Sequence, residues 1–261
     1  MKYAIVSKKD TYSHEVENKI RNILDENHWV YDKENPNLVI CVGGDGTLLY
    51  ALHCYIQQLD KINFLGIHTG TLGFFTDYTD KELDQCMYDI LHKQPDIFTS
   101  SLLEIKLDNL EKPIYALNEM RVENIVKSQE MEIYIDGEYF ETCKGSGICL
   151  STQAGSTAYN RSLGGAIIDS GISLMQLCEI TSIQHSKQRS LGNPYIMMND
   201  RIITMRSNTF DTAYLCYDHL NMPLKDTSEI VCKMSNLKVR FARYRAVSYT
   251  HLRAHETGAY L

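Results

Sequence analysis

The chain has 261 residues, 44% of them hydrophobic and 23% charged, which is enough apolar material for one large or two ordinary globular domains. Its formal net charge is −7, from 26 basic and 33 acidic residues. This balance argues against nucleic acid or an anionic membrane surface as a partner. An anionic ligand would therefore need a local arrangement of backbone amides and cations.

The eight cysteines are scattered, and none forms a Cys-x-x-Cys pair. This pattern predicts reduced, buried thiols of an intracellular protein, and it indicates neither a disulfide framework nor a set of metal ligands. The apolar run at the N-terminus is too short for a signal peptide, and no run approaches the length of a membrane span. We therefore expect a cytoplasmic protein with no membrane partner.

The first hundred residues alternate between strand and helix patterns, which predicts an α/β domain with a parallel sheet. Ligands of such sheets bind beyond the carboxyl ends of the strands. The expected strands are 3–6, 38–42 and 62–67, and the expected helices are 16–24, 48–59 and 83–91, the last with Asp80 as its N-cap.

From about residue 100 the pattern becomes mostly β, which predicts an antiparallel C-terminal domain with one helix over 173–179. Asp136-Gly137 has the composition of a type I′ hairpin turn. The expected strands are 102–107, 114–126, 131–135, 201–205, 213–217, 230–234 and 237–241. The boundary falls near Pro95, giving domains of 1–98 and 99–236.

The most informative motif is Gly43-Gly44-Asp45-Gly46-Thr47, which follows the apolar run 38–42 and precedes a predicted helix. Glycines let a backbone approach a ligand closely, and amides at a helix start favour a phosphate. A carboxylate would repel a phosphate, so Asp45 suggests a general base or a metal ligand. An ordinary strand-to-helix turn is an equal alternative for this motif alone.

Three further features contain candidate binding residues. Asn118-Glu119 interrupts an apolar strand, where a carboxylate suits a vicinal diol and an amide suits an adenine edge, although a solvated Glu at a strand rim is the simpler interpretation. The segment 145–166 is rich in glycines and hydroxyl residues, and Tyr159 offers a stacking face, so we prefer a binding site there to a flexible loop. Asp218-His219 is more simply a satisfied pair, and His68 is the better candidate for ligand contact.

Taken together, these motifs resemble the NAD kinase family, over about residues 1–246 and in family order. The motifs that carry the resemblance are Gly43 to Thr47, His68 to Phe74, Asn118-Glu119, Ser151 to Asn160 and Asp218-His219. Gly-Gly-Asp-Gly alone is shared with phosphofructokinases and lipid kinases, so Asn118-Glu119 and Thr157-Ala158-Tyr159-Asn160 provide the specificity.

The resemblance implies a two-domain fold and transfer of a phosphoryl group from ATP or polyphosphate to the adenosine 2′-hydroxyl of NAD, giving NADP. Asp45 would be the general base, Mg²⁺ or another divalent cation would accompany ATP, and the enzyme would be a homodimer or homotetramer. Gly43, Gly44, Gly46 and Thr47 would bind the donor phosphates. The implied NAD-binding residues are Asp45, Gly46, His68, Leu72, Gly73, Phe74, Asn118, Glu119, Ser151, Thr157, Ala158, Tyr159, Ser162 and His219.

Two features depart from the family pattern. Ser146 stands where the family usually has Asp, which is a dinucleotide contact across the subunit interface, so its loss is expected to retune NAD affinity. Residues 237–246 fit the family as a return segment to the first domain, whereas 247–261 look like translated adapter or read-through sequence.

Two other functions remain open. A lipid kinase shares the glycine motif but needs a greasy acceptor channel, whereas the 151–160 segment is small and polar. A dinucleotide-binding regulator without turnover is suggested by Ser146 and by the unusual tail over 247–261, and the intact Asp45 argues against it.

Overall fold

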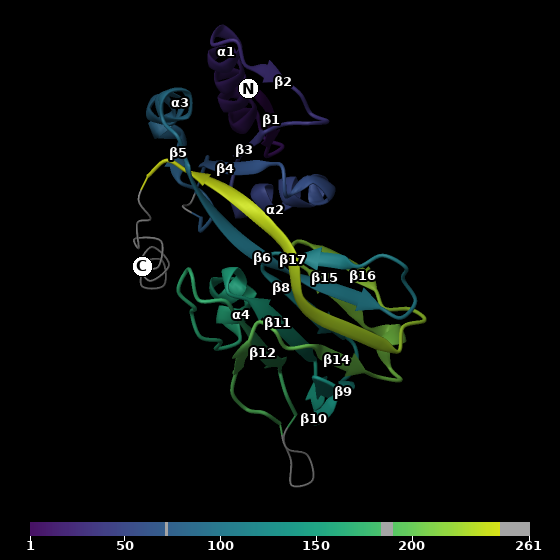
Figure 1. Ribbon diagram of the computed structural model, residues 1–261. Coiled ribbons are helices and arrows are strands. Elements are labelled where there is room, and N and C mark those ends of the chain that lie inside the picture. The colour runs from purple at the N-terminus through teal and green to yellow at the C-terminus, as the bar shows by residue number, and fades with distance from the viewer. Residues whose placement is uncertain (71–72, 184–189, 246–261) are drawn as a thin grey trace, which may run out of the picture. The chain divides into compact units, whose positions relative to one another are not determined.

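The computed structural model describes residues 1–70, 73–183 and 190–245, and it divides the chain into two units (Figure 1). The first unit combines residues 1–99 with the segment that starts at Lys238, and the second contains residues 100–237. Two long strands continue from one unit into the other along the chain: β6 (Asp96–Leu107) and β17 (Glu229–Arg243). The predicted tail over 247–261 lies outside the described residues.

The first unit is the predicted α/β fold, built on a parallel sheet in the order β2-β1-β3-β4. β5 and the end of β17 also pair with β4 in parallel, the latter through Phe241 and Phe64. Its strands are β1 (Lys2–Ser7), β2 (Val30–Tyr31), β3 (Leu38–Val42), β4 (Asn63–His68) and β5 (Tyr78–Thr79). Its helices are α1 (Thr11–Glu26), α2 (Asp45–Cys54) and α3 (Leu83–His92), with short 3₁₀ turns η1 (Ile56–Gln58) and η2 (Asp80–Glu82).

The second unit consists of two antiparallel sheets, which confirms the predicted β-rich half. One sheet has the order β13-β12-β11-β8-β15-β16, and the other contains β10-β9-β14-β17 with β6 and β7. The remaining strands are β7 (Ile114–Ala116), β8 (Glu119–Glu123), β9 (Gln129–Ile135), β10 (Glu138–Gly145), β11 (Gly147–Thr152), β12 (Leu174–Ile180), β13 (Tyr195–Met198), β14 (Ile203–Arg206), β15 (Tyr214–Tyr217) and β16 (Leu220–Pro223). The short helical segments are η3 (Ala154–Thr157), α4 (Tyr159–Ser162) and η4 (Phe210–Thr212).

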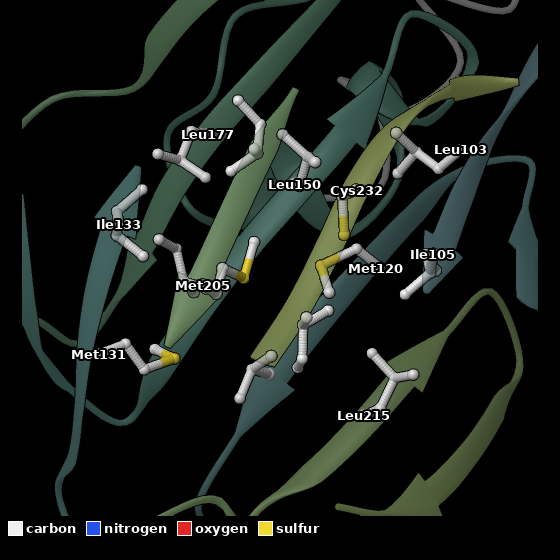
Figure 2. Packing of buried hydrophobic residues seen from close by; sticks show 14 of the residues in the cluster. Leu103, Ile105, Met120, Met131, Ile133, Leu150, Leu177, Met205, Leu215 and Cys232 are labelled. Carbon is white, nitrogen blue, oxygen red and sulfur yellow. The ribbon is translucent and has the colours of Figure 1, made fainter. Parts of the chain in front are cut away.

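The core of the second unit lies between its two sheets. Figure 2 shows Met120, Leu150 and Leu177 from one sheet packed with side chains of the other, among them Met205 and Cys232. All five are buried, as expected where alternate residues of two facing sheets interdigitate. This sandwich holds β8 and β11, which present the candidate binding residues described below.

Some local predictions are confirmed and others are wrong. Asp136 and Gly137 both have positive φ, 53° and 86°, and join Ile135 to Glu138 as a two-residue type I′ turn. The predicted helix over 173–179 is wrong: this segment is β12, a strand paired on both sides by β11 and β13. A central strand buried on both faces has the same continuous apolar run as a buried helix, so periodicity does not separate them.

The predicted N-cap at Asp80 is also wrong. Asp80 lies inside the 3₁₀ turn η2, and the N-cap of α3 is Glu82. Thr79 is the N-cap of η2, in a capping box in which Glu82 accepts hydrogen bonds from the Thr79 amide and hydroxyl, each at 3.0 Å. The predicted strand 114–126 is broken at Leu117-Asn118, and the predicted strands 230–234 and 237–241 are one strand, β17.

Candidate active site

The Gly43–Thr47 loop lies at the carboxyl end of the parallel sheet, directly after β3. The Gly43 amide donates to the Ile67 carbonyl at 2.9 Å, which ties the loop to the neighbouring strand β4. Gly44 is the N-cap of α2, and Asp45 is its first residue. A Cβ on Gly43 would lie 2.2 Å from Thr47 Oγ1, so only glycine fits there. The first turn of α2 therefore presents backbone amides at the sheet edge, as an anion site requires.

The Asp45 carboxylate is held by the second glycine loop. The Phe74 amide donates to Oδ2 at 2.9 Å, and the Phe75 amide donates to Oδ1 at 3.1 Å. A Cβ on Gly73 would lie 2.2 Å from Oδ1, so the absence of a side chain at Gly73 allows this approach. A carboxylate oxygen can accept more than one hydrogen bond, so both oxygens keep capacity for a substrate hydroxyl.

The second loop starts at His68, the last residue of β4, which is 2% exposed. Its Nδ1 accepts a hydrogen bond from the Gly70 amide at 3.1 Å, which leaves the ring proton on Nε2. Ser13 and Thr69 exchange a hydroxyl hydrogen bond at 2.9 Å beside it. Leu72, which the resemblance implied as a binding residue, lies outside the described residues.

In the second unit, Asn118 and Glu119 stand at the start of β8, and both are buried, at 8% and 5% exposure. The interpretation of Glu119 as a solvated residue at a strand rim is therefore wrong. Asn118 Oδ1 and Glu119 Oε2 have no hydrogen-bond partner among the described residues. Buried polar atoms are nearly always paired in folded proteins, so these two oxygens are candidates for ligand contact.

The environment of Glu119 raises its pKa to about 7. Burial is the main cause, and the negative charge of Asp218 adds to it. The positive charge of Arg121 and the backbone amide of Tyr159 act in the opposite direction. Glu119 is therefore close to the balance between its charged and neutral forms at neutral pH.

Asp218 fixes the backbone that carries Asn118 and Glu119. Its carboxylate accepts hydrogen bonds from the amides of Leu117 at 2.9 Å and Asn118 at 2.7 Å. Asp218 has a positive φ of 49°, at the turn from β15 to β16, and His219 follows it. The Asp218 carboxylate is thus a positioning group for the backbone at the start of β8.

The segment after β11 is ordered by hydrogen bonds and close packing, so it is a built structure and the flexible-loop alternative fails. Thr152 Oγ1 donates to the Leu117 carbonyl at 2.6 Å. A Cβ on Gly155 would lie 2.0 Å from the Asn118 carbonyl oxygen, so Gly155 is needed for packing. Gln176 forms two 2.8 Å hydrogen bonds with the backbone of Ala166.

This ordering brings several predicted residues together around the start of β8. Ser151 pairs with Glu119 in the sheet, and Tyr159 begins α4, whose Ser162 hydroxyl donates to the Tyr159 carbonyl at 2.7 Å. Thr157 ends η3, and Ala158 links it to α4.

Ser146 lies between two glycines that packing requires. Its carbonyl accepts from the Asn124 amide at 2.8 Å, and its amide donates to the Ile180 carbonyl at 2.9 Å. A Cβ on Gly147 would lie 1.9 Å from the Val122 carbonyl oxygen. These two glycines therefore allow neighbouring backbone to approach closely, whereas the glycine-rich sequence alone indicates ligand access.

Sequence reasoning missed Arg121. Its guanidinium carbon lies 3.9 Å from the centre of the Tyr159 ring, and its Nη1 lies 2.6 Å from Glu123 Oε1. The sequence does contain a pattern that points to Arg121. Alternate residues of a strand share a face, so Arg121 lies on the same face of β8 as Glu119 and Glu123.

Residues 1–70, 73–183 and 190–245 contain no cluster of three or more His, Cys, Asp or Glu side chains that could hold a metal ion. Over the same ranges, no helix combines the length and apolar character that crossing a bilayer requires.

A Gly-Gly-Asp-Gly loop at a helix start on a parallel sheet, together with a sandwich that presents buried acceptors, defines the class of the nucleotide-binding kinases. The comparisons identify the family. Residues 6–95 match the model of the ATP-NAD kinase N-terminal domain, and residues 117–244 match that of the ATP-NAD kinase C-terminal domain.

Relatives and solved structures agree with these matches. The chain is 38% identical over 251 residues to the NAD kinase of Staphylococcus aureus strain JH9, covering 94% of this chain and 93% of the relative. The fold is similar to that of yeast NADH kinase complexed with NADH, with a TM-score of 0.83 at 19% identity over 100% of this chain and 88% of that one. It is also similar to an Archaeoglobus fulgidus NAD kinase in complex with ATP, with a TM-score of 0.75 at 20% identity over 94% of both chains.

This chain belongs to the NAD kinase family, and the lipid-kinase alternative falls away.

Proposed function

We propose that this protein transfers the terminal phosphoryl group of ATP to the 2′-hydroxyl of the adenosine ribose of NAD, giving NADP and ADP. The hydroxyl oxygen forms a bond to the γ-phosphorus as the bond to the leaving ADP oxygen breaks. The hydroxyl proton passes to the Asp45 carboxylate. Amides of the Gly43–Thr47 loop bind the donor phosphates.

The observation that carries this proposal is the geometry of Asp45. A general base needs a fixed position before anything else, and two backbone amides at 2.9 and 3.1 Å hold this carboxylate at the start of α2. Its oxygens retain lone pairs for the substrate hydroxyl. In the second unit, the unpaired oxygens of Asn118 and Glu119 support their assignment to the adenine and the ribose hydroxyls.

The remaining assignments follow from the family resemblance and from chemistry. His68, Gly73, Phe74, Ser151, Thr157, Ala158, Tyr159, Ser162 and His219 complete the dinucleotide contacts. A divalent cation such as Mg²⁺ would accompany ATP and neutralise charge on its phosphates.

Self-association and location are part of the same proposal. The last strand of the described six-stranded sheet, β13, exposes Tyr195, Ile196 and Met198, and an apolar edge of this kind supports a homodimer or homotetramer. All eight cysteines are free thiols, which supports a cytoplasmic location.

The proposal is tested by measuring NADP formation from NAD with ATP and Mg²⁺, in wild type and in Asp45→Asn. The amide is nearly isosteric but is a poor base, so we expect kcat to fall roughly 10²–10⁴-fold while NAD still binds. Asp84→Asn, which changes a carboxylate in the first turn of α3, is the matched control and should keep wild-type turnover. Polyphosphate replaces ATP in a parallel assay, to identify the donor.

Two results would overturn the proposal. If wild type binds NAD but forms no NADP with either donor, the protein is a binder and has no kinase activity. If Asp45→Asn retains wild-type turnover, the base is another group.

A further inference from the structure

Arg121 occupies the centre of a charged cluster on β8. Its side chain is 17% exposed, its Nη1 contacts Glu123 Oε1 at 2.6 Å, and its Nε lies 4.0 Å from Glu119 Oε1. Arg121 Nε has no hydrogen-bond partner among the described residues. Glu123 therefore holds one end of the guanidinium, while the other end faces the candidate ribose-binding carboxylate.

The same guanidinium covers part of the Tyr159 ring. The distance from Cζ to the ring centre is 3.9 Å, within the range of a cation–π contact. Tyr159 also packs against the small cluster of Cys149, Cys178 and Ile180. Arg121 and this cluster together fix the ring plane, and they reduce the ring surface that remains for a ligand.

We propose that Arg121 is a positioning residue for dinucleotide binding, which orients the Tyr159 ring and places a positive charge beside the carboxylate of Glu119. This inference rests on the proposed function, because it takes Glu119 and Tyr159 as NAD-binding residues. The proposal places Arg121 away from the reacting atoms. Substituting it should therefore change the KM for NAD and leave kcat almost unchanged.

The electrostatic part of the argument follows from the groups around Glu119. Burial and the charges of Asp218 and Glu123 raise its pKa, whereas Arg121 and the Tyr159 amide lower it to the balance at about 7. The titratable neighbours in the surrounding strands and α4 are Arg121, Glu123, Cys149, Cys216, Asp218 and Tyr159. Removing the positive charge of Arg121 raises the pKa of Glu119 and so increases the protonated fraction of its carboxyl group. A protonated carboxyl group accepts a hydrogen bond from a ribose hydroxyl less well than a carboxylate does.

The test compares Arg121→Met with wild type in two measurements. NMR titration of ¹³C-labelled glutamate in the ligand-free protein should show Glu119 of the variant titrating at higher pH. Loss of Glu119 ionisation should raise the KM for NAD about fivefold at pH 7, and this part of the effect should disappear by pH 9. The rise caused by losing the guanidinium above Tyr159 should remain at every pH, and kcat should stay within about twofold of wild type. The fivefold value assumes that the pKa of Glu119 rises by about one unit in the variant. The ionised fraction of Glu119 at pH 7 then falls from about a half to about a tenth.

Arg121→Lys separates the two roles of the side chain. It keeps a positive charge but not the planar group above Tyr159, so Glu119 should titrate close to its wild-type pH while the KM for NAD stays raised at every pH. This variant also keeps the test decisive if Arg121→Met does not fold.

Arg206→Met is the matched control, because Arg206 also lies over a tyrosine, at 4.9 Å from the Tyr134 ring, and pairs with Glu229 at 2.7 Å. It should leave the Glu119 titration and the KM for NAD unchanged. A wild-type titration of Glu119 in Arg121→Met, or a pH-independent rise in its KM, would overturn the proposal. Absence of kinase activity in wild type would refute the proposed function alone, because the NMR titration needs no substrate.

Discussion

Two charged neighbours act on the pKa of the Glu119 carboxylate in opposite directions, the positive Arg121 and the negative Asp218. Arg121 favours its ionised form, whereas Asp218 favours its protonated form while holding the backbone amides of Leu117 and Asn118. Because the effects of the two neighbours on the Glu119 pKa have opposite signs, variants at these positions should move it in opposite directions.

Asp218→Asn tests this sign and the positioning role together. Asparagine tolerates the φ of 49°, but its amide group presents a donor where the Leu117 and Asn118 amides need acceptors. We expect the free energy of unfolding to fall by about 1–3 kcal/mol, the KM for NAD to rise, and Glu119 to titrate at lower pH. Urea unfolding, a KM assay and the same NMR titration provide the measurements.

Asp136→Asn serves as the control for Asp218→Asn. Asp136 also has a positive φ, of 53°, and its carboxylate accepts from the Ile202 amide at 2.9 Å in a hairpin of the second unit. Its substitution should leave the KM for NAD unchanged. An unaltered KM in Asp218→Asn would show that the Asp218 carboxylate does not set the position of Asn118 and Glu119.

At the scale of elements, the end of β17 completes the first unit. Phe241 pairs with Phe64 in β4, and its ring stacks on Phe75 at 5.4 Å and on Phe98 at 6.2 Å. The backbone amide of Phe75 in turn donates to Asp45. A strand from the far end of the sequence thus supports the loop that holds the candidate base.

Phe241→Ala should therefore affect both stability and activity. The side chain is 3% exposed, so its loss leaves a cavity and should lower the free energy of unfolding by about 3–5 kcal/mol. We also expect kcat to fall more than the KM for NAD rises, because Phe75 and hence Asp45 lose support. Denaturant unfolding and steady-state kinetics measure both effects.

Tyr88→Ala is the control for Phe241→Ala, since Tyr88 is 55% exposed and stacks only at the surface on His92 among the ring contacts of the described residues. It should change stability by less than about 1 kcal/mol. Equal losses in the two variants would contradict a special role for Phe241.

At the scale of the whole molecule, the cysteines report on burial. Cys54 is exposed and Cys216 is half-buried, whereas the other six thiols are buried. Burial raises the pKa of the thiols of Cys41, Cys86, Cys143, Cys149 and Cys232, and only a thiolate reacts readily.

Titration of the native protein with a thiol reagent should therefore show a single fast phase from Cys54, a slower one from Cys216, and the rest only after unfolding in urea. Cys54→Ser should remove the fast phase and leave the others. Rapid reaction of three or more thiols in the native protein would contradict the burial described here.

Features that depend on residues close together in the sequence could be predicted, whereas features that depend on contacts between distant segments could not. The Asp136-Gly137 turn and the α/β alternation depend on local chemistry, and both were predicted. The strand identity of β12 depends on pairing with β11 and β13, which no local window contains. At the site, the glycine motif and Asn118-Glu119 were found from their residue types, whereas the role of Arg121 required knowing that Tyr159 lies over β8.

The contribution of β17 to the first unit has a consequence for synthesis of the protein. Residues 100–237 form a unit from one continuous stretch of chain, so this unit can fold as soon as that stretch has left the ribosome. The first unit is complete only when Phe241 has been made, although most of its residues are made earlier. We therefore expect the two units to finish folding during translation in the reverse of their order along the sequence.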